Sequence, residues 1–185
     1  MFAEEALAVA DAVDARRQRG ENVGLLAGVP ILIKDNIEVK GWPTSAGAVM
    51  LRDVSAREDA TLVTTLRNQG AILIGKTAMH ELAAGITGAS SLTGYTHNAW
   101  CEGRSPGGSS SGSAAAAAPG YVPPALVTVN AGSVRLPAAF NWLLVLPFTI
   151  GALSTEGILP LSPPQVIPVP FVRISAALRS VPVLL

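Results

Sequence analysis

Short apolar stretches that alternate with helical patterns constrain the fold of this chain more than any other feature. Three such stretches are predicted to be buried strands, at 29–33, 71–75 and 125–129. Helical spacing or an alanine run predicts helices at 3–19, 59–69 and 110–118, with a short helix from 77. Asp59 and either Ser110 or Ser111 are the expected N-caps. Strands that alternate with helices bury a sheet between helical layers, so we expect an α/β fold.

The last third of the chain has a different composition. Eight prolines occur between Pro137 and Pro182. This density predicts neither long helices nor central strands. The chain then ends with the apolar sequence "SVPVLL", which would normally pack against a partner strand or helix.

Charge, cysteine content and the N-terminal residues indicate the expected partners and the cellular compartment. The 13 basic residues balance the 13 acidic ones, and no basic block occurs, so we expect neither a nucleic-acid nor a membrane-surface partner. Cys101 is the single cysteine, which rules out an internal disulfide and fits a reducing cytoplasm. The first residues carry acids where a signal peptide carries positive charge, and no apolar run reaches spanning length. We therefore expect a cytoplasmic protein.

One motif suggests nucleotide binding. The sequence "GAILIGKT", from Gly70 to Thr77, matches the G-x-x-x-x-G-K-[ST] pattern of a phosphate-binding loop. That mechanism needs the middle residues to form a loop whose N–H groups face phosphate. Here they are "AILI", which is typical of a buried strand, so we expect no nucleotide site.

The sequence "GRSPGGSSSGSAAAAAPG", from Gly103 to Gly120, can be interpreted in three ways. A linker would need a self-sufficient domain on each side, and the chain is short for two. A phosphate-binding loop would need a lysine after its last glycine. A loop with a catalytic serine would need a base and an oxyanion site elsewhere. Taken alone, "GGSSSGS" is weak evidence for a catalytic loop, and a Gly/Ser turn that caps a helix is the favoured interpretation.

Lys34 is the best candidate for the base. His80 and His97 are the only histidines, and no G-x-S-x-G motif accompanies them. Lys34 ends an apolar strand pattern, where loss of water would lower its pKa and let the neutral amine accept a serine proton. The alternative is an ordinary strand-end lysine that pairs with Asp35.

A second serine follows small residues in "NAGSVRLPAAF", from Asn130 to Phe140. Successive backbone N–H groups in such a turn can converge on an anion, as an oxyanion hole requires. The alternative is that Ser133 simply caps the helix that follows.

Four ordered segments together resemble the amidase signature family: "GVPILIKDNIEVKG", "GAILIGKTAMHELA", "PGGSSSGSAAAAA" and "AGSVRLPAAF". The resemblance is clear over 28–163 and faint in the proline-rich 164–185, so the whole chain, 1–185, is interpreted as a partial amidase domain. It implies a layered α/β/α fold around a mixed β-sheet, here incomplete.

The resemblance also implies roles for individual residues. Ser133 would be the nucleophile that forms the acyl-enzyme, and Ser109, preceded by a cis peptide bond, would be the bridging serine. Lys34 would be the base that acts through Ser109. The backbone N–H groups of Asn130, Ala131, Gly132 and Ser133 would hold the oxyanion. No cofactor or metal is implied.

Members of this family hydrolyse non-peptide amide C–N bonds, and one branch supplies ammonia to a tRNA-bound acyl group. The motifs "GGSSSGS" and "NAGS" resemble those of general amidases, so we expect a stand-alone amidase with a small-molecule amide substrate. The alternatives are an impaired amidase remnant and a relative of the A subunit of glutamine amidotransferases.

Departures from the family pattern favour the remnant. Val129 replaces an aspartate that would partner Arg135, and Trp142 replaces a glycine. Because the family domain is more than twice as long, we interpret the chain as a fragment or a decayed copy of marginal stability. Strands 71–75 and 125–129 are then expected near an unpaired sheet edge, with exposed apolar residues at 142–146 and 181–185. Such surfaces favour aggregation or a homo-oligomer.

Overall fold

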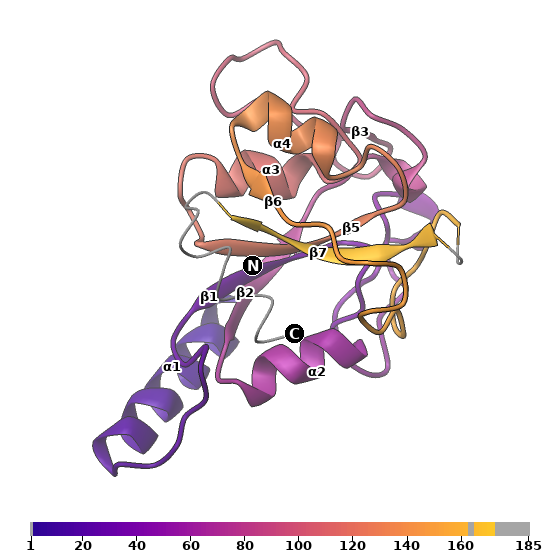
Figure 1. Cartoon of the computed structure of the whole chain (residues 1–185). Coiled ribbons are helices and arrows are strands. Elements are labelled where there is room, and N and C mark those ends of the chain that lie inside the picture. Colours follow the sequence, from indigo (N-terminus) through magenta and orange to yellow (C-terminus); the bar gives the residue numbers. More distant parts are fainter. Residues whose placement is uncertain (1, 163–164, 173–185) are drawn as a thin grey trace.

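The computed structural model of this protein describes residues 2–162 and 165–172. A five-stranded mixed sheet runs through the molecule in the order β2-β1-β5-β7-β6 (Figure 1). Its strands are β1 (Pro30–Lys34), β2 (Ile72–Thr77), β5 (Pro124–Val129), β6 (Leu144–Val145) and β7 (Ile167–Val172). Strand β1 is parallel to β2 and β5, whereas β7 is antiparallel to β5 and β6. The predicted α/β fold with a mixed sheet is confirmed.

Helices cover both faces of this sheet, as Figure 1 shows. The α-helices are α1 (Ala3–Gln18), α2 (Thr61–Asn68), α3 (Ser111–Ala117) and α4 (Arg135–Asn141). Helices α3 and α4 lie on one face, and α2 lies on the other. Two short 3-10 helices, η1 (Val49–Leu51) and η2 (Glu81–Ala83), and a small ladder of β3 (Ala89–Ser90) with β4 (Gly94–Tyr95) complete the fold.

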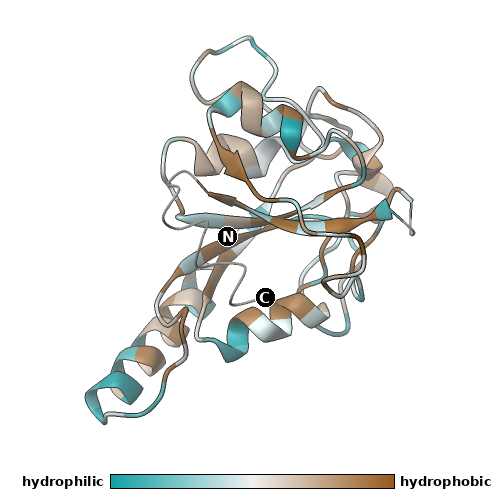
Figure 2. Ribbon diagram, viewed as in Figure 1, coloured by the Kyte–Doolittle hydropathy of each residue, from teal (hydrophilic) through white to brown (hydrophobic). Residues whose placement is uncertain are grey.

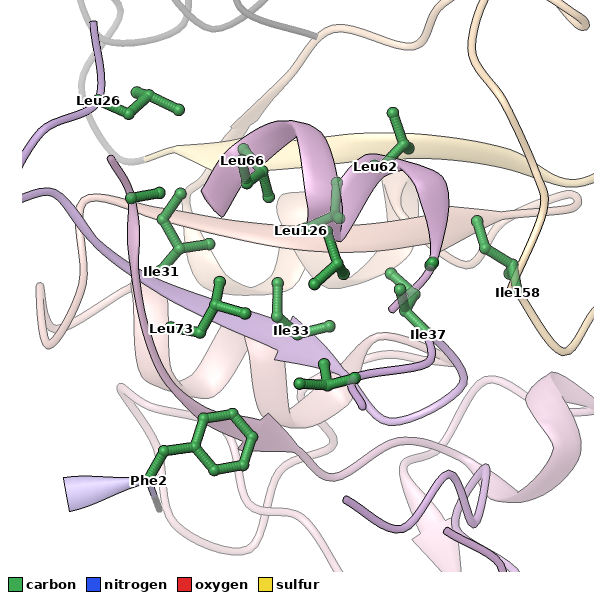
Figure 3. Packing of buried hydrophobic residues seen from close by; sticks show 14 of the residues in the cluster. Phe2, Leu26, Ile31, Ile33, Ile37, Leu62, Leu66, Leu73, Leu126 and Ile158 are labelled. Carbon is green, nitrogen blue, oxygen red and sulfur yellow. The ribbon is translucent and has the colours of Figure 1, made fainter. Parts of the chain in front are cut away.

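The two cores follow from the alternation of side chains along the strands. Ile31 and Ile33 of β1 pack with Leu62 and Leu66 of α2, as Figure 3 shows. Leu32 points to the opposite face and packs with the alanines of α3. The strands are accordingly among the most hydrophobic parts of the ribbon (Figure 2). Because residues two apart share a face, Lys34 follows Leu32 onto the side of α3.

The predicted helices and strands are largely confirmed, with two local corrections. Thr77 is the last residue of β2 rather than the start of a helix, and the next turn is the 3-10 helix η2. Asp59 does not cap α2, because its carboxylate accepts a hydrogen bond from the Lys40 N–H at 2.8 Å and pairs with Arg67 at 3.0 Å. The N-cap residue is Ala60.

The expectation that prolines exclude central strands is wrong for β7. This strand contains Pro168 and Pro170, yet it pairs with β5 over six residues and lies between β5 and β6. Strand β6 pairs only with Val172 and Phe171. Among the described residues, both prolines therefore have a neighbouring strand on one side alone, which is where a sheet tolerates a missing N–H group.

The expected positions of the sheet edges are half right. Within the described residues strand β2 is indeed an edge strand, but β5 is interior because β1 and β7 flank it. Trp142, Leu144 and Leu146 are exposed as expected, with 86%, 41% and 44% of their surface accessible, but Leu143 is only 7% exposed and packs in the core, so the expectation for 142–146 holds in part. The expectation for 181–185 lies outside the described residues.

Candidate functional site

Lys34 is the centre of a buried polar cluster drawn from three parts of the chain. It is the last residue of β1 and has no accessible surface. Its Nζ lies 2.8 Å from Ser109 Oγ, 3.1 Å from Thr128 Oγ1 and 3.3 Å from the Thr128 carbonyl oxygen. Ser109 precedes α3, and Thr128 lies in β5. The cluster thus forms where β1 and β5 run side by side beneath the first turn of α3.

Burial changes the protonation of this amine. Removal from water lowers the pKa of Lys34 to about 7, because a buried ammonium loses its hydration. Near neutral pH a substantial fraction of the amine is then unprotonated. Lys34 does not pair with Asp35, whose carboxylate lies 3.2 Å from Lys76 Nζ instead. The geometry therefore favours the interpretation of Lys34 as a base over the ordinary strand-end lysine.

The Gly/Ser loop before α3 packs tightly against residues 78–86. The Gly108–Ser109 peptide bond is cis. A Cβ atom on Gly108 would lie 2.8 Å from the Ile86 carbonyl carbon, so only glycine fits there. The Ser109 carbonyl oxygen accepts a hydrogen bond from the His80 N–H at 2.9 Å. The loop is therefore a closely packed structural element and not a linker, and Gly108 allows its close approach to Gly85 and Ile86.

Ser133 lies in the turn between β5 and α4. Its carbonyl oxygen accepts a hydrogen bond from the Ser110 N–H at 3.2 Å, which links this turn to the residue after Ser109. Ser133 is 7% exposed, and its hydroxyl has no hydrogen-bond partner among the described residues. It is not the N-cap of α4, because that position is Val134. The N-cap alternative for Ser133 is therefore wrong.

The backbone of this turn has unused donors. Among the residues that the structure describes, none accepts a hydrogen bond from the N–H groups of Asn130, Ala131, Gly132 or Ser133. Ser133 is buried, Asn130 and Gly132 are half-buried and Ala131 is exposed, so these N–H groups can bind water or a ligand. A run of unpaired N–H groups is what an anion-binding turn requires.

The structure brings the three predicted side chains together unequally. A hydrogen bond joins Lys34 to Ser109 directly. Ser133 is tied to the serine loop through its backbone, and in the described part of the chain no hydrogen bond joins its hydroxyl to that of Ser109. The cluster can therefore take a proton from Ser109, while the predicted step from Ser133 to Ser109 stays a prediction.

Sequence reasoning missed Thr128 and Asn36. The Asn36 Nδ2 atom donates to Thr128 Oγ1 at 3.0 Å and to the Leu159 carbonyl oxygen at 2.9 Å. Asn36 is buried, with 1% of its surface accessible. A signal existed, because Thr128 is the one polar residue in the otherwise apolar strand "PALVTV". Asn36 lies two residues after Lys34, close to the candidate base.

The apparent phosphate-binding motif is a strand, as predicted. Residues Ile72–Thr77 form β2 and pair in parallel with β1 over its full length. Lys76 Nζ donates to the Pro43 carbonyl oxygen at 2.6 Å and to Thr44 Oγ1 at 3.0 Å, besides its ion pair with Asp35. The lysine of the motif is therefore already occupied inside the protein.

The departures from the family pattern have visible structural consequences. Val129, where an aspartate was expected, is 6% exposed and packs in the apolar core under α3 and α4. Arg135 has no ion-pair partner among the described residues, and its guanidinium donates to the Ala131 carbonyl oxygen at 2.8 Å. Trp142 occupies the left-handed C-cap of α4, with φ of 59°.

Residues 2–162 and 165–172 contain neither a membrane-spanning helix nor a metal-binding cluster. No helix there is both long and apolar enough to cross a bilayer. No group of three or more His, Cys, Asp and Glu side chains is arranged to hold a metal ion. The cytoplasmic location and the absence of a nucleic-acid partner remain predictions.

Comparison with known proteins places these features in context. The sequence model of the Amidase family matches residues 1–173. The glutamyl-tRNA(Gln) amidotransferase A subunit of Symbiobacterium thermophilum is 46% identical over 157 residues, which are 84% of this chain and 32% of that protein. Its counterpart in Gloeobacter violaceus is 44% identical over 156 residues, again 84% of this chain and 32% of that protein.

Solved structures show the same relationship. The native peptide amidase of Stenotrophomonas maltophilia matches 98% of this chain and 38% of its own, with a TM-score of 0.92 and 38% identity. An allophanate hydrolase variant of Kluyveromyces lactis matches 83% of this chain and 26% of its own, with a TM-score of 0.76 and 36% identity. The chain thus spans about a third of the length of its curated relatives, which is 32% for the two named above.

Proposed function

This chain belongs to the Amidase family, and on that premise we propose that its site hydrolyses the C–N bond of a small-molecule amide through an acyl-enzyme on Ser133. The observation that carries the proposal is the 2.8 Å contact between Ser109 Oγ and the buried Nζ of Lys34. Burial keeps part of the lysine neutral near pH 7, as a general base requires.

The first half of the reaction uses this base through a relay. Neutral Lys34 takes the proton of Ser109, and Ser109 takes the proton of Ser133 as the Ser133 oxygen attacks the amide carbonyl carbon. The carbonyl oxygen gains negative charge and lies against the unpaired N–H groups of residues 130–133. The proton returns along the same path to the amide nitrogen, the C–N bond breaks, and the amine leaves.

The second half restores the enzyme. Water gives one proton to the relay as its oxygen attacks the ester carbonyl carbon of the acyl-enzyme. The ester bond to Ser133 then breaks, and the proton returns to the serine oxygen. No cofactor or metal takes part in this route.

Covalent labelling tests the nucleophile. A fluorophosphonate should label the wild-type chain once, and mass spectrometry of the digested product should find the label on Ser133. Ser133→Ala should abolish labelling, because it removes the attacking oxygen. Ser110→Ala is the matched control, because Ser110 lies in the same loop but donates to the Thr128 carbonyl oxygen at 3.4 Å.

The two variants together decide the assignment. Loss of labelling in Ser133→Ala and its retention in Ser110→Ala would support the proposal. Equal labelling of both variants would contradict it. A well-folded wild-type chain without any labelling would favour the impaired-remnant alternative, in which residues outside this third of the domain are needed.

A second candidate is an amidotransferase-type glutaminase. It is favoured by the curated relatives, which are glutamyl-tRNA(Gln) amidotransferase A subunits with 46% and 44% identity. Ammonia release separates the candidates. A stand-alone amidase should release ammonia from simple carboxamides at least as fast as from glutamine, whereas the second candidate should prefer glutamine.

A further inference from the structure

We propose that Thr128, held by Asn36, is a positioning residue that turns the lone pair of neutral Lys34 toward the Ser109 hydroxyl. This inference rests on the proposed function, because it concerns the direction in which the relay passes its proton. It assigns a role to two buried polar residues that make no contact with substrate in the proposed reaction.

Hydrogen-bond counting leads to this assignment. A neutral lysine amine has two N–H donors and one lone pair. Three oxygen atoms lie within reach of Lys34 Nζ, and two of them belong to Thr128. The base can accept a proton from Ser109 only if both N–H groups point elsewhere. Thr128 offers two acceptors, one for each.

The carbonyl oxygen of Thr128 presents no ambiguity. It lies 3.3 Å from Lys34 Nζ and can only accept a hydrogen bond. One N–H of Lys34 is therefore directed at it.

The hydroxyl of Thr128 could in principle donate to the amine, but Asn36 prevents this. The Leu159 carbonyl oxygen accepts from Asn36 Nδ2 at 2.9 Å, which fixes the orientation of the amide. Asn36 Nδ2 also donates to Thr128 Oγ1 at 3.0 Å, and Asn36 Oδ1 accepts the Thr128 proton at 3.3 Å. A hydroxyl has one donor and two acceptor positions. With the donor and one acceptor position used by Asn36, the remaining acceptor position faces Lys34.

The second N–H of Lys34 consequently points to Thr128 Oγ1, and the lone pair is left for Ser109. If Thr128 instead donated to Lys34, the amine would have to donate to Ser109. The bridging serine could then no longer give its proton to the base. Asn36 and Thr128 thus set the direction of the proton relay.

Titration of Lys34 tests this arrangement without relying on catalysis. The chain has only three lysines, Lys34, Lys40 and Lys76, so NMR of side-chain-labelled lysine gives three resolvable signals. Thr128→Val keeps the shape of the side chain but removes the hydroxyl. The Lys34 ammonium then loses an acceptor, so its pKa should fall by about 1.

The reaction rate gives the second measurement. At a pH where Lys34 is neutral in every variant, Thr128→Val should slow fluorophosphonate labelling of Ser133 by about tenfold or more, because the lone pair is no longer directed. Thr128→Ser restores the hydroxyl and should recover the rate to within about twofold. Thr77→Val is the matched control, because Thr77 ends the neighbouring strand β2 and its hydroxyl contacts Ser113 at 2.5 Å. It should change neither quantity.

Each outcome bears on one claim. A Lys34 titration and a labelling rate in Thr128→Val equal to those of Thr77→Val would overturn the positioning role and leave the proposed function intact. A lowered pKa without labelling in any variant would support the positioning role and contradict the proposed function. If Thr128→Val does not fold, Asn36→Ala replaces it. That variant frees the Thr128 proton to turn toward Lys34, so it should slow labelling, and an unchanged rate would overturn the inference.

Discussion

The buried polar groups that contact Lys34 find partners within the chain, whereas several large apolar side chains between Phe140 and Ile150 lie in solvent. Lys34, Ser109 and Thr128 have no accessible surface, and hydrogen bonds join them. By contrast, Trp142 is 86% exposed and Ile150 is 60% exposed. The first region belongs to β1, β5 and the loop before α3. The second begins in the last turn of α4 and includes β6, the last strand of the sheet order among the described residues.

The difference separates what the site needs from what the surface tolerates. A buried polar group without a partner is costly, so the residues that satisfy Lys34 must all be present within the chain. Exposed apolar side chains cost much less in a folded monomer, and their effect is on association. The geometry at Lys34 therefore depends on contacts among residues 34–133 and with Leu159 rather than on the surface around Trp142. The expected aggregation or homo-oligomer formation through that surface remains a prediction.

The largest expected effect is the pH dependence of stability caused by Lys34. Its pKa is about 7 in the folded chain and near 10.5 in the unfolded chain. Between these values the unfolded chain binds the proton that the folded chain has released, so stability rises with pH. The free energy of unfolding should gain up to about 5 kcal/mol over this range, and the gain is lost as the pH falls to 7.

Urea unfolding of wild type and Lys34→Met between pH 7 and 10 measures this effect. The variant should lose the rise that belongs to Lys34. Lys40→Met, which removes an exposed lysine, should keep it. Parallel curves for wild type and Lys34→Met would show that the buried amine does not titrate as described, and the contrast between the two regions would weaken.

A smaller effect tests the tight packing beside the site. In an ordinary helix Gly→Ala stabilises by up to about 1 kcal/mol. A Cβ atom on Gly112 of α3 would lie 2.6 Å from the Ala78 carbonyl oxygen, so the sign should reverse. Gly112→Ala should lower the free energy of unfolding by about 2 kcal/mol.

Gly132→Ala is the control for this substitution. Its Cβ would meet only the Leu136 side chain, at 2.9 Å, and that side chain can move. It should therefore cost less in the same urea titration. If the two variants were equally stable, the backbone contact between α3 and residue 78 would not be as close as the structure has it.

The smallest effect concerns the exposed region. Trp142 adopts φ 59° and ψ 44°, a left-handed conformation that glycine adopts without strain. Because its ring is 86% exposed, few contacts are lost on replacement. Trp142→Gly should raise the free energy of unfolding by about 1 kcal/mol.

Trp142→Ala separates strain from the loss of the ring. It removes the same ring but keeps the Cβ atom, so it should gain less than the glycine variant in thermal or urea unfolding. Equal stabilities for the two variants would mean that the backbone at Trp142 stores no strain, and that this region differs from the site only in exposure.

Much of the site could be predicted because its residues lie at recognisable local positions. Lys34 ends an apolar run, and Ser109 and Ser133 lie in turns rich in small residues. The network around the base could not be predicted in this way. Thr128 and Asn36 are 92 residues apart, and only the pairing of β1 with β5 brings them into contact.

Sequence patterns were enough to locate β1, β2, β5 and the helices α1, α2 and α3, and to pick out the residues with reactive groups, but they failed for β7. Apolar periodicity and turn residues act over a few neighbours, and that range suffices for such features. The neighbours of each strand are set by long-range packing, which local patterns do not encode. This packing placed β5 inside the sheet. It also accommodated Pro168 and Pro170 in β7, because β6 pairs only with Phe171 and Val172 and does not extend to the two prolines, which lack an N–H group. It also lowered the pKa of Lys34, since its amine is buried only when β1, β5 and the loop with Ser109 pack together.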